Sequence, residues 1–253
     1  TTTGLNDMGM IFISDLHLHD ARAETTAQFL AFLESHCKGI DALYILGDLF
    51  EAWIGDDDDY ALASTVKSAL SACHASGTQL FIQRGNRDFM LGEAFAAEIG
   101  AQLLPDHIVI DCLGEPTLLM HGDLLCTRDS EYLAFRAQAH NPLWQQQMLS
   151  QPLPVRRALA ENARQASMAR QQQLIGANQL DAITDVTPEE VIDTMRRFGV
   201  RRLIHGHTHR PARHALEIDG QPAERIVLGD WYTQESHLSA DENGLTLSYR
   251  QAG

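Results

Sequence analysis

The sequence predicts a layered α/β fold: a helix-covered sheet that packs against a second sheet and carries a helical insert. The chain of 253 residues opens with three apolar runs that alternate with segments of helical spacing, a βαβαβα pattern. From Thr127 to about Gly199 the spacing becomes helical and is broken by prolines. Two further β-rich runs, residues 225–228 and 245–249, follow and suggest a second, antiparallel sheet.

The elements of the first half are marked by the type and spacing of their apolar residues. Runs rich in β-branched and aromatic residues predict buried strands at residues 10–14, 42–46, 79–83, 109–112, 117–120 and 202–204. Helical spacing predicts helices at residues 23–37, 61–76 and 89–99. Gly77 and Gly100 suit the ends of the last two helices, because glycine readily adopts a left-handed backbone.

The stretch from 128 to 199 is interpreted as a helical insert, or cap, within one domain that spans residues 1–253. Helices are expected around Tyr132 and Phe135 and at residues 145–149, 155–173 and 188–198. Pro188 suits the first turn of the last helix, with Thr187 as its N-cap. A turn is expected at residues 241–244, before the final strand.

Composition excludes several classes of protein. The formal net charge of −15 disfavours nonspecific binding of nucleic acid. No apolar run approaches the roughly 18 residues that span a bilayer, and the polar start, residues 1–9, lacks the pattern of a signal peptide. The four cysteines are scattered without a C-x-x-C pair, so all four are expected to be reduced and buried in a cytoplasmic protein.

Metal-competent side chains follow the predicted strands at the point where each strand ends. Asp15, Asp48, Asn86 and His121 occupy such positions, and His207 does so after residues 202–204. Because sites of α/β sheets collect at the carboxyl ends of the strands, these residues are expected at one rim.

Three histidines alternate in the segment Ile-His-Gly-His-Thr-His-Arg, at positions 205, 207 and 209. Alternate residues of an extended segment point to the same side, and neutral imidazole is the commonest ligand for divalent transition metals. A solvated histidine-rich turn is the alternative interpretation. The acidic run at residues 56–59 is interpreted as a solvated loop, since a calcium loop would alternate its ligands.

Five short motifs occur in one order along the chain: Asp15-x-His17, Gly47-Asp48, Gly85-Asn86-Arg87-Asp88, His121-Gly122-Asp123 and Gly206-His207-x-His209. Together they resemble the D-x-H, G-D, G-N-H-[DE], H-G and G-H-x-H motifs of the calcineurin-like metallophosphoesterases, whose fold is a β-sandwich flanked by helices. The resemblance implies that one metal ion is bound by Asp15, His17 and His209. A second would be bound by Asn86, His121 and His207, and Asp48 would bridge the two. His205, His19 and His140 fall outside the motifs and are expected as supporting or surface residues.

This ligand set fits hydrolysis of a phosphate ester or anhydride. Two divalent ions about 3.5–4 Å apart clamp a phosphoryl group and activate water, so that no serine or cysteine nucleophile is needed. The mixed carboxylate, amide and imidazole ligands suit manganese, iron or zinc better than calcium. The family has His where this chain has Arg87, and arginine binds phosphate but donates no proton at neutral pH. That departure favours a pyrophosphate bond, whose leaving group is already a good one.

Longer stretches, at residues 42–58, 85–92, 120–127 and 203–211, resemble one subfamily, the UDP-2,3-diacylglucosamine pyrophosphohydrolases of lipid A biosynthesis. The resemblance implies attack at the α-phosphorus, with UMP and 2,3-diacylglucosamine 1-phosphate as products. It also implies two Mn²⁺ ions, a helical cap, and a cytoplasmic enzyme attached peripherally to the inner membrane. No nucleic acid and no obligate protein partner are expected.

The resemblance also assigns residues to the reaction and the substrate. Asn86, Arg87 and His121 would act at the reacting phosphate. Substrate contacts would come from Asn86, Arg87, Asp129, Arg157, Ser167, Gln171 and His207. The subfamily has an Asn and a Lys soon after the serine; here Gln171 is the nearest equivalent and no lysine follows, so Arg164 or Arg170 is a candidate to supply the lost charge.

Apolar residues of the insert have two interpretations. They either line a groove for acyl chains, where each buried methylene contributes about 0.8 kcal/mol, or form the core of the cap itself. The residues concerned are Tyr132, Phe135, Leu143, Trp144, Leu149, Leu153 and Leu159. Two other functions stay open: a dinuclear-metal phosphodiesterase or phosphatase for a soluble nucleotide or phosphoprotein, and a non-enzymatic scaffold.

Overall fold

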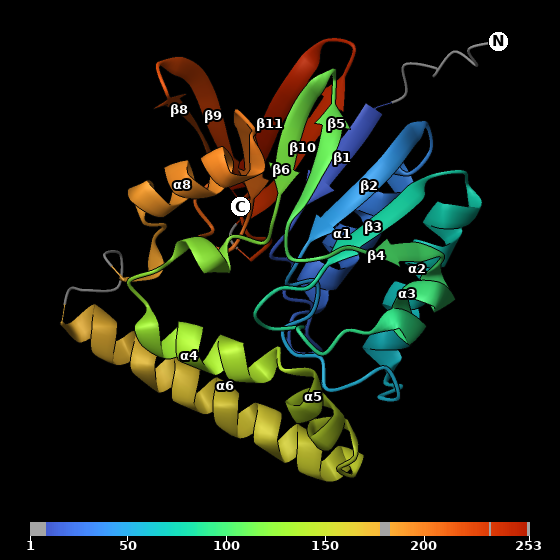
Figure 1. The fold of residues 1–253 in the computed structure, drawn as a ribbon. Coiled ribbons are helices and arrows are strands. Elements are labelled where there is room, and N and C mark those ends of the chain that lie inside the picture. Colours follow the sequence, from blue (N-terminus) through green and yellow to red (C-terminus); the bar gives the residue numbers. More distant parts are fainter. Residues whose placement is uncertain (1–8, 178–182, 233, 252–253) are drawn as a thin grey trace.

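The computed structural model describes residues 9–177, 183–232 and 234–251. It confirms the predicted fold class, since two sheets are stacked and helices flank them (Figure 1). The polar start, residues 1–8, and part of the long stretch from 171 to 181 lie outside the described residues.

The first sheet has six strands in the order β11-β10-β1-β2-β3-β4. Their bounds are β1 Gly9–Ile13, β2 Ile40–Leu46, β3 Gln79–Gln83, β4 Ala101–Leu103, β10 Gln234–Asp241 and β11 Gly244–Gln251. Strands β1 to β4 are parallel, whereas β10 pairs with β1 in the antiparallel sense and forms a hairpin with β11. The carboxyl ends of β1, β2 and β3 therefore meet at one edge.

Three helices cover the outer face of this sheet: α1 Ala23–His36, α2 Ala61–Ala75 and α3 Glu93–Ile99. Their buried side chains, such as Phe29 and Leu70, join strand residues such as Ile45 in one apolar cluster. Helix α3 begins at Glu93 and not at residue 89 as predicted. Gly92 before it is extended, and Asp56 accepts hydrogen bonds from the backbone N–H groups of Gly92 and Phe95, which fixes the start of the helix.

The second sheet has the order β5-β6-β7-β9-β8, with bounds β5 Ile108–Cys112, β6 Glu115–Leu119, β7 Arg202–His205, β8 Ala212–Ile218 and β9 Gln221–Val227. Apolar residues from both sheets, among them Phe12, Leu46 and Ile204, interleave between them. Helix α8, Pro188–Phe198, packs on the outer face through Val191 and Met195.

The expectation of an antiparallel second sheet built from residues 225–228 and 245–249 is wrong in two respects. The second sheet is mixed, because β6, β7 and β9 run parallel. Residues 245–249 lie in β11 of the first sheet, because the expected turn near 241–244 folds β11 directly back on β10. Leu238 of β10 then pairs with Phe12 of β1, which brings the hairpin into the first sheet.

Three helices of the insert lie across the strand ends, at the bottom of Figure 1: α4 Ser130–Ala139, α5 Pro142–Leu149 and α6 Leu153–Gly176. Asn141 caps α5, so the helix starts at Pro142. Among the residues of these three helices, only Ala139 and Arg156 are buried. These helices therefore have no apolar core of their own. No helix within the described ranges is long and apolar enough to cross a membrane.

The acidic run at residues 56–59 is only in part the solvated loop that was expected, because Asp57 and Asp59 are exposed but Asp58 is buried. Asp56 accepts hydrogen bonds from Trp53 Nε1 and from the start of α3. Asp57 is paired with Arg156 and Asp58 with Arg157, both at the start of α6. The run therefore joins the loop after β2 to the helices of the insert, because Asp57 and Asp58 pair with arginines of α6.

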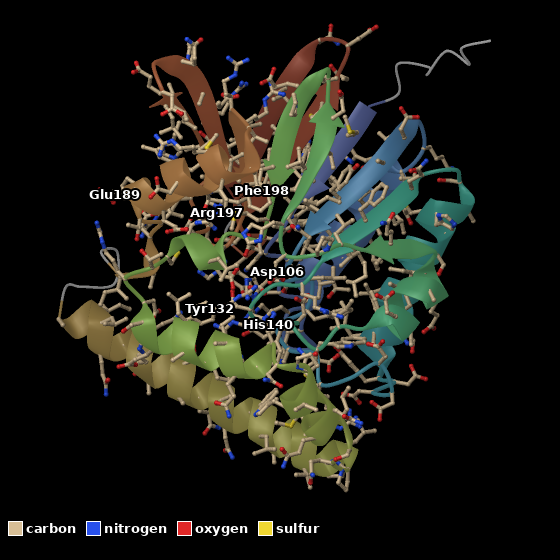
Figure 2. All side chains as sticks on the ribbon, in the orientation of Figure 1. Asp106, Tyr132, His140, Glu189, Arg197 and Phe198 are labelled. Atoms are coloured by element: carbon tan, nitrogen blue, oxygen red, sulfur yellow. A yellow bond between two sulfur atoms is a disulfide. The ribbon has the colours of Figure 1, made fainter. Side chains whose placement is uncertain are left out.

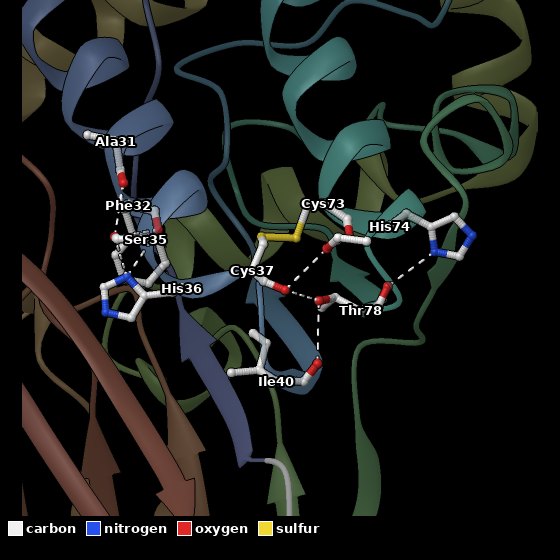
Figure 3. The surroundings of a disulfide bond; sticks show 10 residues. Ala31, Phe32, Ser35, His36, Cys37, Ile40, Cys73, His74 and Thr78 are labelled. Atoms are coloured by element: carbon white, nitrogen blue, oxygen red, sulfur yellow. Dashed lines mark hydrogen bonds between the residues drawn. A yellow bond between two sulfur atoms is a disulfide. The ribbon is translucent and has the colours of Figure 1, made fainter.

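The expectation that all four cysteines are reduced is wrong for Cys37 and Cys73, which form a disulfide (Figure 3). Helices α1 and α2 end side by side, with the two Cα atoms 5.3 Å apart, a separation that a disulfide spans. Thr78 Oγ1 donates a hydrogen bond of 2.6 Å to the carbonyl of Cys37 at the same place. Cys112 and Cys126 are free and buried.

Candidate functional site

The seven predicted ligands lie together in the loops that leave the strands at the carboxyl-end rim. They are Asp15, His17, Asp48, Asn86, His121, His207 and His209. Asp15, His17, Asp48 and His121 are each at most 3% exposed. Burying so many ionisable groups is unfavourable unless a partner of opposite charge compensates them.

One group of ligands joins the first motif to the last. His209 Nε2 lies 3.3 Å from Asp15 Oδ1 and 3.3 Å from His17 Nε2. Asp15 Oδ1 is buried and has no hydrogen-bond partner within the described residues. Its Oδ2 is used differently, because it accepts hydrogen bonds from Ser14 Oγ and from the backbone of His207. A buried carboxylate oxygen that accepts no hydrogen bond and faces two imidazoles has the donor chemistry of a cation site.

A second group surrounds Asn86. Its Oδ1 lies 3.0 Å from His121 Nε2 and 2.9 Å from His207 Nδ1. The other ring nitrogen of His121 lies 2.8 Å from the carbonyl of Leu46, which fixes the orientation of the ring.

Asp48 lies between the two groups. Its Oδ2 is 3.5 Å from His17 Nε2 and 3.7 Å from His121 Nε2. Its Oδ1 accepts a 2.8 Å hydrogen bond from the backbone of Arg87. One carboxylate oxygen is thus within reach of both groups, whereas the other is held by the neighbouring loop.

The backbone of these loops is strained in a consistent way. Asp15, His17, Asp48, His207 and His209 all have a positive φ, between 49° and 68°. This left-handed region is uncommon for residues other than glycine, and such strain concentrates at functional sites.

Two glycines of the motifs are needed for close approach. A Cβ on Gly85 would lie 2.0 Å from Asp48 Oδ1, and one on Gly206 would lie 2.2 Å from Asp15 Oδ2. The ligand carboxylates occupy the space that any other residue would fill.

Asp88, the last residue of the third motif, binds the backbone of the loop that carries Asp48. It is fully buried and accepts hydrogen bonds from the backbone N–H groups of Gly85 at 2.7 Å and Leu49 at 2.8 Å. Burial, together with the nearby charge of Asp48, raises the pKa of Asp88 to about 6. The motif contains this residue, but its role in joining two loops depends on tertiary contacts.

Glu51 was not predicted as a site residue, and it contacts the first ligand group. Its carboxylate lies 3.4 Å from His17 Nδ1, accepts hydrogen bonds from Tyr232 and Arg22, and lies 3.6 Å from Arg164 of α6. Burial opposes its ionisation, but His17 and Arg22 outweigh that effect, so its pKa falls to about 2. Only its place at the end of the second strand motif could have indicated it.

Asp123 joins the rim to helix α4. It accepts hydrogen bonds from the hydroxyl of Tyr132 and from Arg136 Nε, and the same arginine binds Asp106 at 2.8 Å. Figure 2 shows Asp106, Tyr132 and His140 between α4 and the sheets. His140 lies against the ring of Phe89 and, with Tyr132, belongs to the side of α4 that faces the rim.

A cavity of about 550 Å³ lies between the rim and the three cap helices. Apolar side chains from both sides line it, for example Phe89 and Met90 from the rim and Phe135, Trp144 and Leu159 from the cap. Asn86, Arg87, Glu51 and Ser167 supply its polar wall. Arg87 Nε is buried and makes no hydrogen bond to any residue that the structure describes. The cavity therefore combines aromatic and aliphatic side chains with polar groups, which come from the rim beside the candidate metal ligands and from cap residues such as Arg164, Ser167 and Arg170.

The predicted substrate residues divide into two sets. Asn86, Arg87 and Ser167 line the cavity, and His207 stands at the ligand group. Arg157 and Gln171 do not line it and are exposed.

Asp129 is bound in a different way. It caps α4 and accepts two hydrogen bonds from Arg170, which itself lines the cavity together with Arg164.

The apolar candidates of the insert also divide. Tyr132, Phe135, Trp144 and Leu159 line the cavity, whereas Leu143, Leu149 and Leu153 do not. Leu143 is 75% exposed, which places it at the outer surface. Because the cap helices lack a buried core, the groove interpretation fits four of the seven residues.

The three histidines outside the motifs do not join the ligand groups. His205 ends β7, is fully buried and contacts Gly206 and Arg225; burial and that arginine lower its pKa to about 3. His19 accepts a hydrogen bond from the backbone of Ala21.

The family model and the curated relatives that match this chain point to one family. Residues 8–211 match the family model described as calcineurin-like phosphoesterase. The chain is 54% identical to a UDP-2,3-diacylglucosamine hydrolase from Xanthomonas campestris pv. campestris, over 95% of this chain and 98% of the relative. It is 51% identical to a protein of the same name from Cellvibrio japonicus, with the same coverage. Among solved structures, it is similar to an archaeal phosphodiesterase at 12% identity and a TM-score of 0.46, covering 97% of this chain and 99% of that one. The chain therefore belongs to the calcineurin-like phosphoesterase family, in the branch that contains the UDP-2,3-diacylglucosamine hydrolases.

Proposed function

We propose that this protein hydrolyses the pyrophosphate bond of UDP-2,3-diacylglucosamine at the α-phosphorus, giving UMP and 2,3-diacylglucosamine 1-phosphate for lipid A biosynthesis. The proposal rests on two features that lie side by side. Seven side chains of types that bind metals converge at the rim, and a largely apolar cavity opens beside them. A phosphoryl group at the ligands and acyl chains in the cavity would account for both. The names of the relatives at 51% and 54% identity support the same substrate.

The residues present fit a pair of divalent ions. Asp15, His17 and His209 would hold one ion, Asn86, His121 and His207 the other, and Asp48 would reach both. The unpaired Asp15 Oδ1 and the position of Asp48 Oδ2 between His17 and His121 support this division. The ligand types suit manganese, iron or zinc better than calcium, and Mn²⁺ is proposed among these from the resemblance to the subfamily. When bound, such ions supply Lewis acidity and stabilise negative charge on a phosphoryl group.

Arg87 is proposed to bind the phosphate groups of the substrate. Its Nε donor is buried beside the ligands without a partner among the described residues, and its backbone is tied to Asp48 at 2.8 Å. A guanidinium keeps its proton at neutral pH, so it neutralises charge and does not protonate a leaving group. Asn86 and His121, which belong to the second ligand group, are proposed to act with Arg87 at the reacting phosphate. His207 is proposed to contact that phosphate too.

The cap is proposed to select the lipid end of the substrate. In this assignment the chain is one domain, residues 1–253, with the insert at 128–199 as its cap. Phe135, Trp144 and Leu159 would cover acyl chains, each buried methylene contributing about 0.8 kcal/mol, and Ser167 would contact the sugar. Asp129 is engaged by Arg170, so the pair is proposed to act together on the sugar in place of the absent lysine. Arg157 and Gln171 are exposed, and a substrate role for them requires contact outside the cavity.

Peripheral attachment to the cytoplasmic face of the inner membrane is the location that we propose. Leu143 and Ile175, on α5 and α6, are 75% and 61% exposed, and exposed leucine and isoleucine on a cap that admits lipid suit contact with a bilayer surface.

The function is tested by incubating the protein with Mn²⁺ and UDP-2,3-diacylglucosamine and measuring UMP and the lipid phosphate. Release of both in equal amounts is expected, and the use of ¹⁸O-labelled water places the label in UMP if attack is at the α-phosphorus. A folded, metal-loaded protein that releases no UMP but hydrolyses soluble phosphodiesters would exclude the lipid substrate and keep the phosphoesterase chemistry.

We expect Arg87→Ala to lower kcat/KM for this substrate by about 10²-fold, the effect of removing one donor that stabilises charge in the transition state. The measurement is steady-state release of UMP at saturating Mn²⁺. Arg84→Ala is the matched control, because Arg84 precedes the same motif but donates to the carbonyl of Leu91. Equal activities of Arg87→Ala and the wild type would remove Arg87 from the phosphate site.

A further inference from the structure

A second cavity, of about 430 Å³, adjoins the first one beside the candidate metal centre. Five residues line both cavities: Glu51, Ala52, Ile54, Ala160 and Arg164. Glu51 stands at the junction, with its carboxylate 3.4 Å from His17 Nδ1 and 3.6 Å from Arg164 Nε. The boundary between the two cavities therefore lies next to the candidate ligand His17.

The two cavities have unlike walls. The first has aromatic and methionine side chains of the rim and the cap in its lining, such as Phe89, Met90 and Trp144, together with polar and charged residues. Among the described residues, the second has Tyr60 as its one aromatic lining residue and no methionine. The wall that belongs to the second alone carries, besides Leu18, the side chains of His19, Asp20, Asp58, Tyr60, Arg157 and Glu161. An acyl chain there would displace water from carboxylates and a guanidinium without replacing its hydrogen bonds, which is unfavourable. The second cavity thus suits a polar group with a flat ring.

We propose that the second cavity binds the nucleoside end of the substrate, while the first binds the lipid end. This inference rests on the function proposed above, since a substrate with a nucleoside on one side of a pyrophosphate and a glycolipid on the other has two unlike ends. Carboxylates such as Asp20 and Glu161 are acceptors for the hydroxyls of a ribose. Tyr60 offers a ring, and the guanidinium of Arg157 a plane, against which a pyrimidine base stacks.

The charged side chains of the second cavity also favour a nucleoside over a phosphate group at that place. Arg157 is paired with Asp58, and Arg164 lies 3.7 Å from Glu161 and near Glu51, so each arginine faces carboxylates. A phosphate group finds little net positive charge there, and it is better placed at the metal ligands and Arg87. The wall therefore favours an uncharged nucleoside beyond the phosphate.

Two bulky substitutions on the same helix test the assignment. Glu161→Trp fills the second cavity, and Ala163→Trp, two residues further along α6, fills the first. Binding of UMP and of inorganic phosphate to the Mn²⁺-loaded proteins is measured by calorimetry, and KM for the glycolipid is measured in parallel. We expect the wild type to bind UMP at least about tenfold more tightly than phosphate. Glu161→Trp should lose that preference, whereas Ala163→Trp should keep it and raise the KM for the glycolipid.

Asn162→Trp, at an exposed position of α6 that lines neither cavity, is the control and should retain the preference, and thermal unfolding checks that each variant is folded. A preference that survives in Glu161→Trp but is lost in Ala163→Trp would overturn the assignment. So would a wild type that hydrolyses the glycolipid but binds UMP no more tightly than phosphate, and in that case the proposed function would stand. If the glycolipid is not hydrolysed and Glu161→Trp still abolishes the preference for UMP, the nucleoside site stands and the lipid substrate fails.

Discussion

Replacing Asp48 by Ala is expected to lower hydrolysis of UDP-2,3-diacylglucosamine by on the order of 10³-fold, the upper range for loss of one charge-stabilising group. Asp48 Oδ2 is the oxygen within 3.7 Å of both His17 and His121, so its removal affects both ligand groups. Its Oδ1 also orients the backbone of Arg87. The measurements are UMP release and the number of Mn²⁺ ions bound per chain, which should fall in the variant.

Two further variants make this result specific. Asp48 has a φ of 55°, which alanine tolerates poorly, whereas asparagine adopts this conformation readily. Asp48→Asn therefore separates loss of the negative charge from loss of the fold, and a large defect is expected there as well. Asp41→Ala, near the opposite end of β2, is the control and should retain activity. A variant of Asp48 with full activity would contradict a dinuclear mechanism and favour a scaffold role.

Arg156→Met is expected to release the cap from the rim and to lower the free energy of unfolding by about 3 kcal/mol, because hydrogen bonds from a charged donor are lost. Arg156 is 3% exposed. Its guanidinium donates to the carbonyl of Ile54 at 2.7 Å and to that of Gln151 at 2.9 Å, and it is paired with Asp57. Without it the carbonyls of the half-buried Ile54 and Gln151 lose their hydrogen-bond donor, whereas the exposed Asp57 keeps its contact with water.

The activity of Arg156→Met should change selectively. We expect the KM for the glycolipid to rise by about tenfold or more, since Arg156 also lines the apolar cavity. Hydrolysis of a small soluble phosphodiester should change by less than about twofold, because the metal ligands lie on other elements. Denaturant unfolding and steady-state kinetics give the two quantities.

Arg157→Met is the matched control for stability. This neighbour is paired with Asp58, but its side chain is 56% exposed, and an exposed ion pair contributes little to stability because water screens it. Arg156→Met and Arg157→Met variants of equal stability would show that the buried arginine does not anchor the cap.

The ligand set illustrates what a sequence pattern can provide. Asp15, Asp48, Asn86 and His121 each follow a strand whose apolar run is clear, and parallel strands place their carboxyl ends at one edge. The shared rim therefore follows from local patterns and the geometry of a sheet. The glycines of the same motifs were visible too. The reason for them is a tertiary contact, because a Cβ on Gly85 would lie 2.0 Å from Asp48 Oδ1.

Other features depend on residues that are distant in the sequence. The local sequence at 56–59 predicts a solvated loop. It does not predict the ion pairs of this run with Arg156 and Arg157, because these arginines belong to α6, about a hundred residues later. Cys37 and Cys73 become partners only because α1 and α2 end side by side on one face of the sheet. Glu51 contacts Arg164 and Tyr232 at the boundary of two cavities, and no local sequence pattern connects these two residues to it.

By itself, then, the sequence determined the βαβ layering, the positions of most helices and strands, and the gathering of the candidate ligands at the rim, because hydrophobic periodicity and strand direction are local properties. Only the tertiary structure decided the sheet to which the last hairpin belongs, the disulfide, the anchoring of the cap and the two cavities. These depend on which faces meet, and pairing between distant segments is set by packing and hydrogen bonding in three dimensions.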